Sequence, residues 1–136
     1  MKKTPESGNN NMNIIGNKES FAFVLGKKTE EDIQQIDIWV SGELLTFVDN
    51  SAYLPQFISS LESELDDLKN GNVDSDYVFL NLGPTLDDVS ARIEINGEQV
   101  FLKCHLYKGD GKIISLRINR DELIECYEAC INSTKN

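Results

Sequence analysis

The sequence has few residues suited to acid–base catalysis at neutral pH, because it contains a single histidine, His105. No serine or cysteine nucleophile motif accompanies this histidine, so the usual activated-nucleophile arrangement is missing. We interpret His105 as a solvated or hydrogen-bonded side chain. The sequence therefore predicts a protein that is not an enzyme and needs no cofactor.

Cysteine is also scarce, and Cys104, Cys126 and Cys130 form an odd set without a paired framework. That pattern is typical of free thiols in a reducing compartment. Cys126 and Cys130 lie one helical turn apart and could share a metal with Cys104 and His105. However, adjacent strand residues point to opposite faces, and a CxxxC spacing is not that of a zinc knuckle. The favoured interpretation is buried, apolar cysteines and no metal.

No apolar run approaches the length of a membrane span. The longest stretches, such as residues 77–82, fall far short of the about 20 residues that a spanning helix needs. The N-terminus has two lysines but lacks the apolar core of a secretory signal. We therefore expect a cytoplasmic protein that does not bind membranes.

The apolar content is sufficient for one folded domain. The chain is 40% apolar and 26% charged, which is an ordinary globular composition, and its 136 residues are close to the commonest domain size. Residues 1–13 are polar and have too little apolar surface to offset their ordering entropy. We expect them to be a mobile segment, followed by a single domain over 14–136.

Acidic residues outnumber basic ones by 23 to 13, which gives a formal charge of −10. Such a charge repels nucleic acid and anionic membranes, and it speeds encounter with basic partners. Solubility alone would explain the same excess. The charge therefore disfavours nucleic acid and anionic membranes as partners, but it does not identify the actual partner.

The first half of the chain predicts strands at 21–25, 33–40 and 44–48. Ser41-Gly42 forms a two-residue hairpin between the last two, which sets Ile38 opposite Leu45 and Ile36 opposite Phe47. The apolar period then becomes helical over 53–69, with Asn50 or Ser51 as the cap and Gly71 after the end. A further strand follows at 77–82.

The second half predicts a three-stranded meander over 89–118 and a final helix that begins at Asn119, with Glu122 completing a capping-box-like pair. The meander turns lie at Asn96-Gly97 and at residues 109–111. They pair Ile93 with Val100, Ala91 with Leu102 and Val89 with Cys104, and then Leu106 with Ile114, Cys104 with Leu116 and Leu102 with Ile118. These side chains share one face, which needs a cover.

The element order βββ-α-ββββ-α predicts an α+β fold. We expect a single antiparallel sheet of about seven strands, with two amphipathic helices packed on one face. The final helix would bury a stripe made of Leu123, Ile124, Tyr127, Cys130 and Ile131.

The outward face of the meander would carry a basic and aromatic cluster. The predicted register sets Arg92 opposite Phe101, Lys103 opposite Arg117 and His105 opposite Ser115, with Tyr107 near the edge. Like charges that face each other across a ladder are unfavourable. A bound anion would relieve them, and so would Glu94 and solvent, which is the simpler interpretation.

The acidic residues lie in groups on the predicted helices and on both sides of the strand at 77–82. Helix carboxylates opposite an apolar stripe are usually only the solvated face. Asp74, Asp76, Asp87 and Asp88 differ, because the turns at the two ends of one short strand can bring them together. The Asp74-x-Asp76 fragment lacks the glycine and the distal glutamate of a calcium loop.

Trp39, the only tryptophan, is out of phase with the apolar residues Ile36 and Ile38 on its strand. It either packs beneath a loop or serves as a contact anchor, because tryptophan is common among interface hot spots. Packing is the favoured interpretation.

Several segments of the N-terminal half belong to one pattern, namely IIGN at 14–17, FAF at 21–23, DIWVSGEL at 37–44 and DNSAYLPQF at 49–57. Together they resemble small bacterial proteins of toxin systems, in particular the immunity proteins of contact-dependent growth inhibition and related polymorphic toxins. Such proteins bind the toxic C-terminal domain of a delivered protein, often a nuclease, and block its active or substrate surface. No residue roles carry over, because these proteins use different surfaces for different toxins.

The resemblance implies a cytoplasmic immunity protein, monomeric in its complex with a cognate toxin domain that we expect to be a basic nuclease. Carboxylates can occupy a phosphate-binding cleft and steer association. The expected partner-binding residues are Glu64, Asp66, Asp67, Asp74, Asp76, Asp87 and Asp88, with Tyr77 and Trp39 as apolar support.

Two other functions fit the composition. A secretion chaperone or adaptor is also small, acidic and α+β, although that class usually begins with a helix and dimerises. A nucleic-acid binder or enzyme would use the basic cluster of the meander, namely Arg92, Phe101, Lys103, His105 and Arg117.

Overall fold

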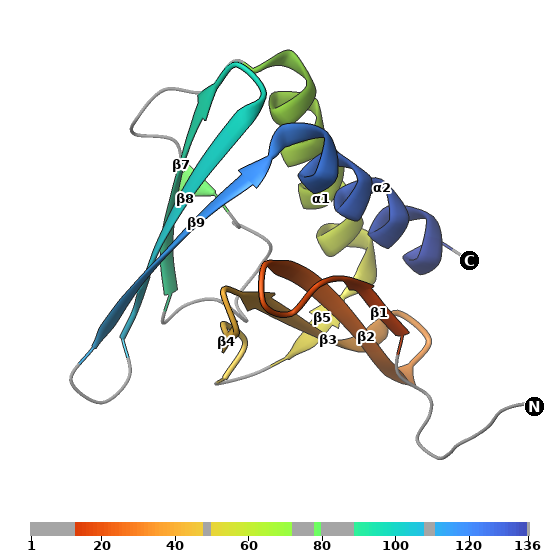
Figure 1. The fold of residues 1–136 in the computed structure, drawn as a ribbon. Helices are drawn as coiled ribbons and strands as arrows, with labels where there is room; N and C mark the ends of the chain where they lie inside the picture. The colour runs from red at the N-terminus through yellow and green to blue at the C-terminus, as the bar shows by residue number, and fades with distance from the viewer. Residues whose placement is uncertain (1–12, 48–49, 72–77, 80–88, 108–110, 136) are drawn as a thin grey trace, which may run out of the picture.

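The computed structural model describes residues 13–47, 50–71, 78–79, 89–107 and 111–135, and these form an α+β fold (Figure 1). The class expected from the sequence is confirmed. The elements are β1 (Asn13–Gly16), β2 (Phe21–Glu30), β3 (Ile33–Val40), β4 (Glu43–Leu44), β5 (Ser51–Tyr53), α1 (Leu54–Asn70), β6 (Val78–Phe79), β7 (Val89–Asn96), β8 (Gln99–Leu106), β9 (Lys112–Asn119) and α2 (Arg120–Thr134).

The strands form two antiparallel sheets, so the expectation of one sheet is wrong. The first is five-stranded, with the order β1-β2-β3-β4 and β5 also paired to β3, and the second is four-stranded, with the order β6-β7-β8-β9. The sequence did not predict β1 or β5. These short strands pair with β2 and β3 and form edges of the first sheet, and the meander belongs to the second sheet.

The helices α1 and α2 lie side by side, with the second sheet along one side of them and the first sheet beneath them (Figure 1). The helix α2 contacts β1 and β2 of the first sheet and β9 of the second, and α1 contacts β5. Apolar side chains from both sheets and both helices form one buried cluster, which includes Phe23, Ile38, Leu61, Leu102 and Tyr127. Neither helix in the described part of the chain is long and apolar enough to cross a membrane.

The hairpin at Ser41-Gly42 is confirmed, because Val40 pairs with Glu43. Its two turn residues have φ values of 51° and 80°, the pair of positive values that a type I′ turn needs. The strand expected over residues 44–48 ends at Leu44. The Thr46 hydroxyl accepts from the Ile38 amide at 3.3 Å, and its own proton goes to the carboxylate of Asp37 at 2.7 Å. The side chain of Thr46 therefore takes the place of a ladder bond.

The expected pair between Ile36 and Phe47 is wrong for the same reason. The chain loops out after the hairpin, and the Ile36 amide donates to the carbonyl oxygen of Asn50 at 2.8 Å. The expected pair between Ile38 and Leu45 has support, because the Leu45 amide donates to the Ile38 carbonyl at 2.8 Å.

The meander register differs from the expected one by two residues in both hairpins. The first turn uses Gly97 and Glu98, closed by Asn96 opposite Gln99, and Gly97 has φ 64° at the first turn position. The second hairpin closes at Leu106 opposite Lys112, so its loop is longer than three residues. The observed pairs are Val89 with Leu106, Ala91 with Cys104, Ile93 with Leu102, Cys104 with Ile114, Leu102 with Leu116 and Val100 with Ile118.

A shift of two residues leaves every side chain on its expected face, because the side-chain period of a strand is two. Ala91, Ile93, Leu102 and Cys104 are accordingly buried in the core that the sheets and helices share. The face was predicted correctly while the partners were not.

The two helices begin differently. Asn119 caps α2 as expected, since its Oδ1 accepts from the amides of Asp121 at 2.9 Å and Glu122 at 3.4 Å. By contrast α1 starts at Leu54 without a side-chain cap, because residues 51–53 belong to β5. The expected cap at Asn50 or Ser51 is wrong, whereas Gly71 ends α1 with φ 65° as predicted.

Some expectations fall outside the described residues. They are the mobile segment, of which only Asn13 is described as the start of β1, the strand at 77–82 beyond β6 itself, and the turn at 109–111 except for Gly111.

Candidate functional site

Glu64 corrects the expected acidic surface, because its side chain is buried. It is 4% exposed on α1, and its Oε1 accepts a hydrogen bond of 2.7 Å from the Tyr127 hydroxyl of α2. Position 64 lies within the helical stripe that also contains Leu61 and Leu68. That spacing was the signal in the sequence that Glu64 points inward. The residue joins the two helices and presents no charge to a partner.

Asp66 and Asp67 lie on the solvent side of α1. Asp66 is exposed and lines a groove of about 630 Å³ between the helices, together with Glu62 and Glu128. Asp67 is half-buried near the end of α1, where its carbonyl oxygen accepts from the Gly71 amide at 3.0 Å. Glu62 and Glu128 were absent from the expected set, although Glu62 and Asp66 are four residues apart and therefore share one helix face.

Two lysines border this acidic groove. Lys69 Nζ lies 3.1 Å from Glu128 Oε2, and Lys135 Nζ lies 2.8 Å from Glu62 Oε2. Exposed ion pairs of this kind stabilise a fold by only about 0–1 kcal/mol. Within the described residues Asp66 makes no ion pair, so the groove keeps negative charge available to a partner.

The other expected acidic residues and Tyr77 stay predictions. Asp74, Asp76, Tyr77, Asp87 and Asp88 all lie outside the described residues.

Trp39 is half-buried on β3, where Lys18 Nζ lies 4.8 Å from the centroid of its ring. Lys18 belongs to the connection between β1 and β2. This arrangement agrees with the interpretation that the ring packs beneath a loop. A contact with a partner through Trp39 stays a prediction.

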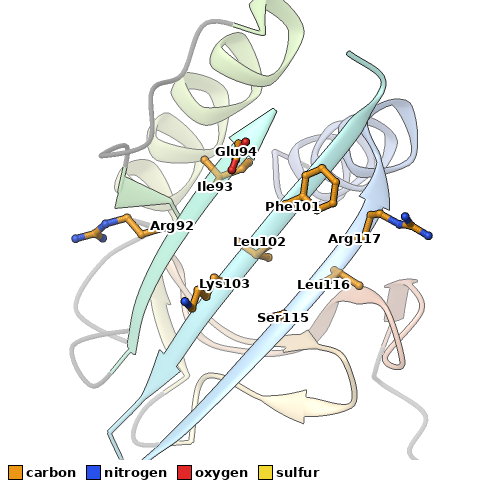
Figure 2. Close-up of a pocket in the computed structure, with 9 residues that line it drawn as sticks. All are labelled: Arg92, Ile93, Glu94, Phe101, Leu102, Lys103, Ser115, Leu116 and Arg117. Carbon is orange, nitrogen blue, oxygen red and sulfur yellow. The ribbon is translucent and has the colours of Figure 1, made fainter. Parts of the chain in front are cut away.

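The outward face of the second sheet carries the basic and aromatic cluster, in a different register from the expected one. Arg92 lies opposite Lys103, and Phe101 lies between Glu94 on one side and Arg117 on the other. Figure 2 shows Phe101 on β8, with Arg92 on β7 and Arg117 on β9 pointing away from each other. The expected pairs of Arg92 with Phe101, Lys103 with Arg117 and His105 with Ser115 are wrong, because the turns lie elsewhere.

This face is open, and its basic side chains form no ion pair with the described residues. Phe101 is 40% exposed beside a shallow hollow of about 400 Å³. Arg92 Nη1 donates to the Ala91 carbonyl at 3.3 Å and to the Ser90 hydroxyl at 3.5 Å. Among the described residues, none of Arg92, Lys103 and Arg117 forms an ion pair.

The three cysteines are buried free thiols. Burial raises the pKa of Cys104 to about 12 and raises that of Cys130 still further. The pKa of Cys126 is raised by burial and, secondarily, by the carboxylates of Glu122 and Glu125. Since thiolates are the reactive form, these thiols are poor nucleophiles and poor ligands at neutral pH. The described residues hold no group of three His, Cys, Asp or Glu placed to bind a metal ion.

A solved protein shares this arrangement of sheets and helices. The fold is similar to that of an immunity protein. That protein is CdiI from Burkholderia dolosa AUO158, of a contact-dependent growth inhibition system, with a TM-score of 0.60 over 89% of this chain and 99% of that one. The resemblance seen in the sequence is thus confirmed for the fold.

Sequence comparison adds nothing further, because no protein-family model and no curated protein sequence matches the chain. The identity to the Burkholderia CdiI is 14%, so the likeness concerns the fold and not the side chains that would contact a partner.

Proposed function

We propose that the protein is an immunity protein that binds a cognate toxin domain and neutralises it by covering its active or substrate-binding surface. The observation that carries the proposal is the fold, which matches almost the whole of an immunity protein and most of this chain. The N-terminal segments that resemble immunity proteins support the same function independently. Binding without chemistry also fits a protein whose thiols are buried and whose only histidine has no nucleophile motif beside it.

The partner in this proposal is a basic toxin domain, and a nuclease is the class that fits the charge. A nuclease needs a cationic cleft to hold phosphates. The groove between α1 and α2 offers carboxylates of Glu62, Asp66 and Glu128 that can occupy such a cleft. A net charge of −10 would also raise the association rate. Asp67, Asp74, Asp76, Asp87 and Asp88 extend the proposed acidic surface.

The function is tested by co-expressing the protein with candidate toxin domains encoded near its gene. We expect growth to be restored and a stable complex to be purified. Continued growth arrest, with the protein folded and expressed, would contradict an immunity role.

The surface is tested by charge reversal in the groove. We expect Glu62→Lys with Asp66→Lys to weaken the complex at least tenfold, which is about 1.4 kcal/mol, because each change replaces an attraction by a repulsion. The matched control is Glu30→Lys with Glu98→Lys, which makes the same charge change at exposed positions that do not line the groove. Equal weakening by both variants would mean that only net charge matters, and no weakening would place the toxin on another surface.

A further inference from the structure

The outward face of β7, β8 and β9 is a surface that the proposed toxin contact does not use. The inward side chains of these strands, such as Ile93 and Leu102, pack in the same cluster as Leu61 of α1 and Leu123 of α2. The helices therefore cover one face of the sheet, and the cationic face lies on the other (Figure 2). A partner on this face leaves the groove between α1 and α2 open.

The described part of the fold provides no ion pair for the cations on this face. Arg92 and Lys103 are directly opposite each other in the ladder, which is an unfavourable arrangement for like charges. Arg117 is exposed on β9, one strand away from Lys103. No carboxylate in the described part of the chain forms an ion pair with these three side chains. Within the described residues they are cations without an ion-pair partner, in a protein whose net charge is −10.

Apolar surface lies between these cations. Phe101 is 40% exposed on the middle strand, and the hollow beside it has a volume of about 400 Å³. Arg92 and Arg117 stand on the two strands that flank β8, so the cationic rims are about 10 Å apart, or two strand spacings. The face thus combines a central aromatic contact with positive charge on both sides.

The charge pattern selects a protein segment over a nucleic acid. A nucleic acid strand extends beyond a patch of this width, and the acidic remainder of the molecule would repel its further phosphates. Glu94 lies opposite Phe101 on the same face. A nucleic acid offers only negative phosphates there, so it has no positive group that could pair with the Glu94 carboxylate. A polypeptide can offer carboxylates to the cations, an apolar side chain to Phe101 and a basic group to Glu94.

From these observations we infer that the outward face of β7–β9 binds an acidic segment of a partner protein that carries an apolar side chain between its carboxylates. Phe101 is the apolar contact, and Arg92, Lys103 and Arg117 hold the carboxylates. This site is separate from the proposed toxin groove, and the inference does not rest on the immunity function.

The test uses a labelled synthetic peptide in which glutamates alternate with phenylalanine and leucine. We expect the peptide to bind the full-length protein, to shift the amide resonances of β7, β8 and β9, and to bind more weakly as salt is raised. A peptide with lysine in place of glutamate and a short oligouridylate serve as the other two probes, and neither is expected to bind.

The decisive variant is Arg92→Glu with Lys103→Glu. It retains a like-charge pair across the ladder, so the cost to the fold hardly changes, while affinity for the acidic peptide should fall at least about tenfold. Lys27→Glu with Lys28→Glu is the matched control, because it makes the same charge change at exposed positions of β2 and should leave affinity within about twofold. Phe101→Ala should weaken binding without changing its salt dependence.

Several results would overturn the inference. They are no binding of the acidic peptide at millimolar concentration, tighter binding of the oligouridylate than of the peptide, or equal loss of affinity in the double variant and its control. Self-association that disappears in the double variant would identify a second copy as the occupant instead. Protection of cells is measured separately, so intact protection by the double variant leaves the proposed function in place.

Discussion

The helix side and the sheet side of this protein are both charged, but their charges stand in different environments. On the helix side one carboxylate, Glu64, is buried and hydrogen-bonded, and exposed carboxylates such as Glu62 and Glu128 pair with lysines. On the sheet side Arg92 and Lys103 face each other without an anionic partner among the described residues. Some charged side chains on the helix side therefore have hydrogen-bond or ion-pair partners within the fold, whereas Arg92 and Lys103 on the sheet side repel each other.

This difference distinguishes charged side chains that stabilise the fold, which we call structural, from charged side chains that are available to a partner. Replacement of a structural charge lowers stability, because it leaves a partner unsatisfied. Removal of a charge that the fold does not need leaves the free energy of unfolding unchanged or raises it, and any loss appears in the affinity for a partner. The following experiments examine both sides in these terms.

The largest effect is expected at the buried link between the helices. Tyr127→Phe removes the hydroxyl that donates to Glu64 and leaves a buried carboxylate with one hydrogen bond fewer. Removing one partner of a buried hydrogen bond costs about 1–3 kcal/mol, so we expect the free energy of unfolding in urea to fall by about 2 kcal/mol. The ring contacts of Tyr127 with Phe21 and Phe23 are retained by phenylalanine, which makes the hydroxyl the only change.

Glu62→Gln is the control for this prediction, since it changes an exposed carboxylate on the same helix. Its effect should stay below about 0.5 kcal/mol. Equal effects of the two substitutions would mean that Glu64 is no more structural than its exposed neighbour.

A second effect comes from the thiols beneath the cationic face. Burial raises the pKa of Cys104 to about 12, above the value of 9.0 that the thiol would have in an unfolded chain. The folded state therefore holds its proton more tightly, so this contribution is complete below pH 9 and is lost as the pH rises from 9 towards 12. The loss is about 1.4 kcal/mol per pH unit for each such thiol.

Stability should accordingly fall more steeply above pH 9 in the native protein than in Cys104→Ala, when urea unfolding is followed at several pH values. The same burial predicts that a thiol reagent at neutral pH modifies Cys104 and Cys130 only at the rate of unfolding. Rapid modification of the folded protein would show that the sheet opens locally.

The sequence predicted those parts of the fold that depend on local chemistry. Ser41-Gly42 can form a type I′ turn, so that hairpin and its pairing were right. Asn119 and Gly71 mark helix ends through their own hydrogen bonds and φ values, and both were right as well. Alternation predicted the buried face of the meander, because a face depends only on whether a position is odd or even.

The sequence could not predict features that depend on contacts between distant segments or on a choice between turns of nearly equal stability. The first meander turn uses Gly97 and Glu98 instead of Asn96 and Gly97, and a shift of one turn position moves every partner by two. β1 and β5 are too short to show a period, so the division into two sheets was missed. Glu64 was assigned to the surface because its charge outweighed its position in the apolar stripe. The toxin-binding surface depends on a partner that leaves no periodic pattern in this chain.

The smallest effect compares single charge pairs on the two sides. A double-mutant cycle of Lys69→Ala and Glu128→Ala should give an attractive coupling of about 0.2–1 kcal/mol. A cycle of Arg92→Thr and Lys103→Thr should give a repulsive coupling of similar size, because these residues face each other in the ladder. Threonine is used on the strands because it retains β propensity.

Salt provides the check on both cycles. The two coupling free energies have opposite signs at low salt, and both should approach zero at about 1 M salt, where the screening length is only about 3 Å. A repulsive coupling that persisted at high salt would point to packing between the side-chain stems instead of charge. An attractive coupling between Arg92 and Lys103 at low salt would mean that the fold itself compensates these cations, and the sheet face would then lose its distinction from the helix side.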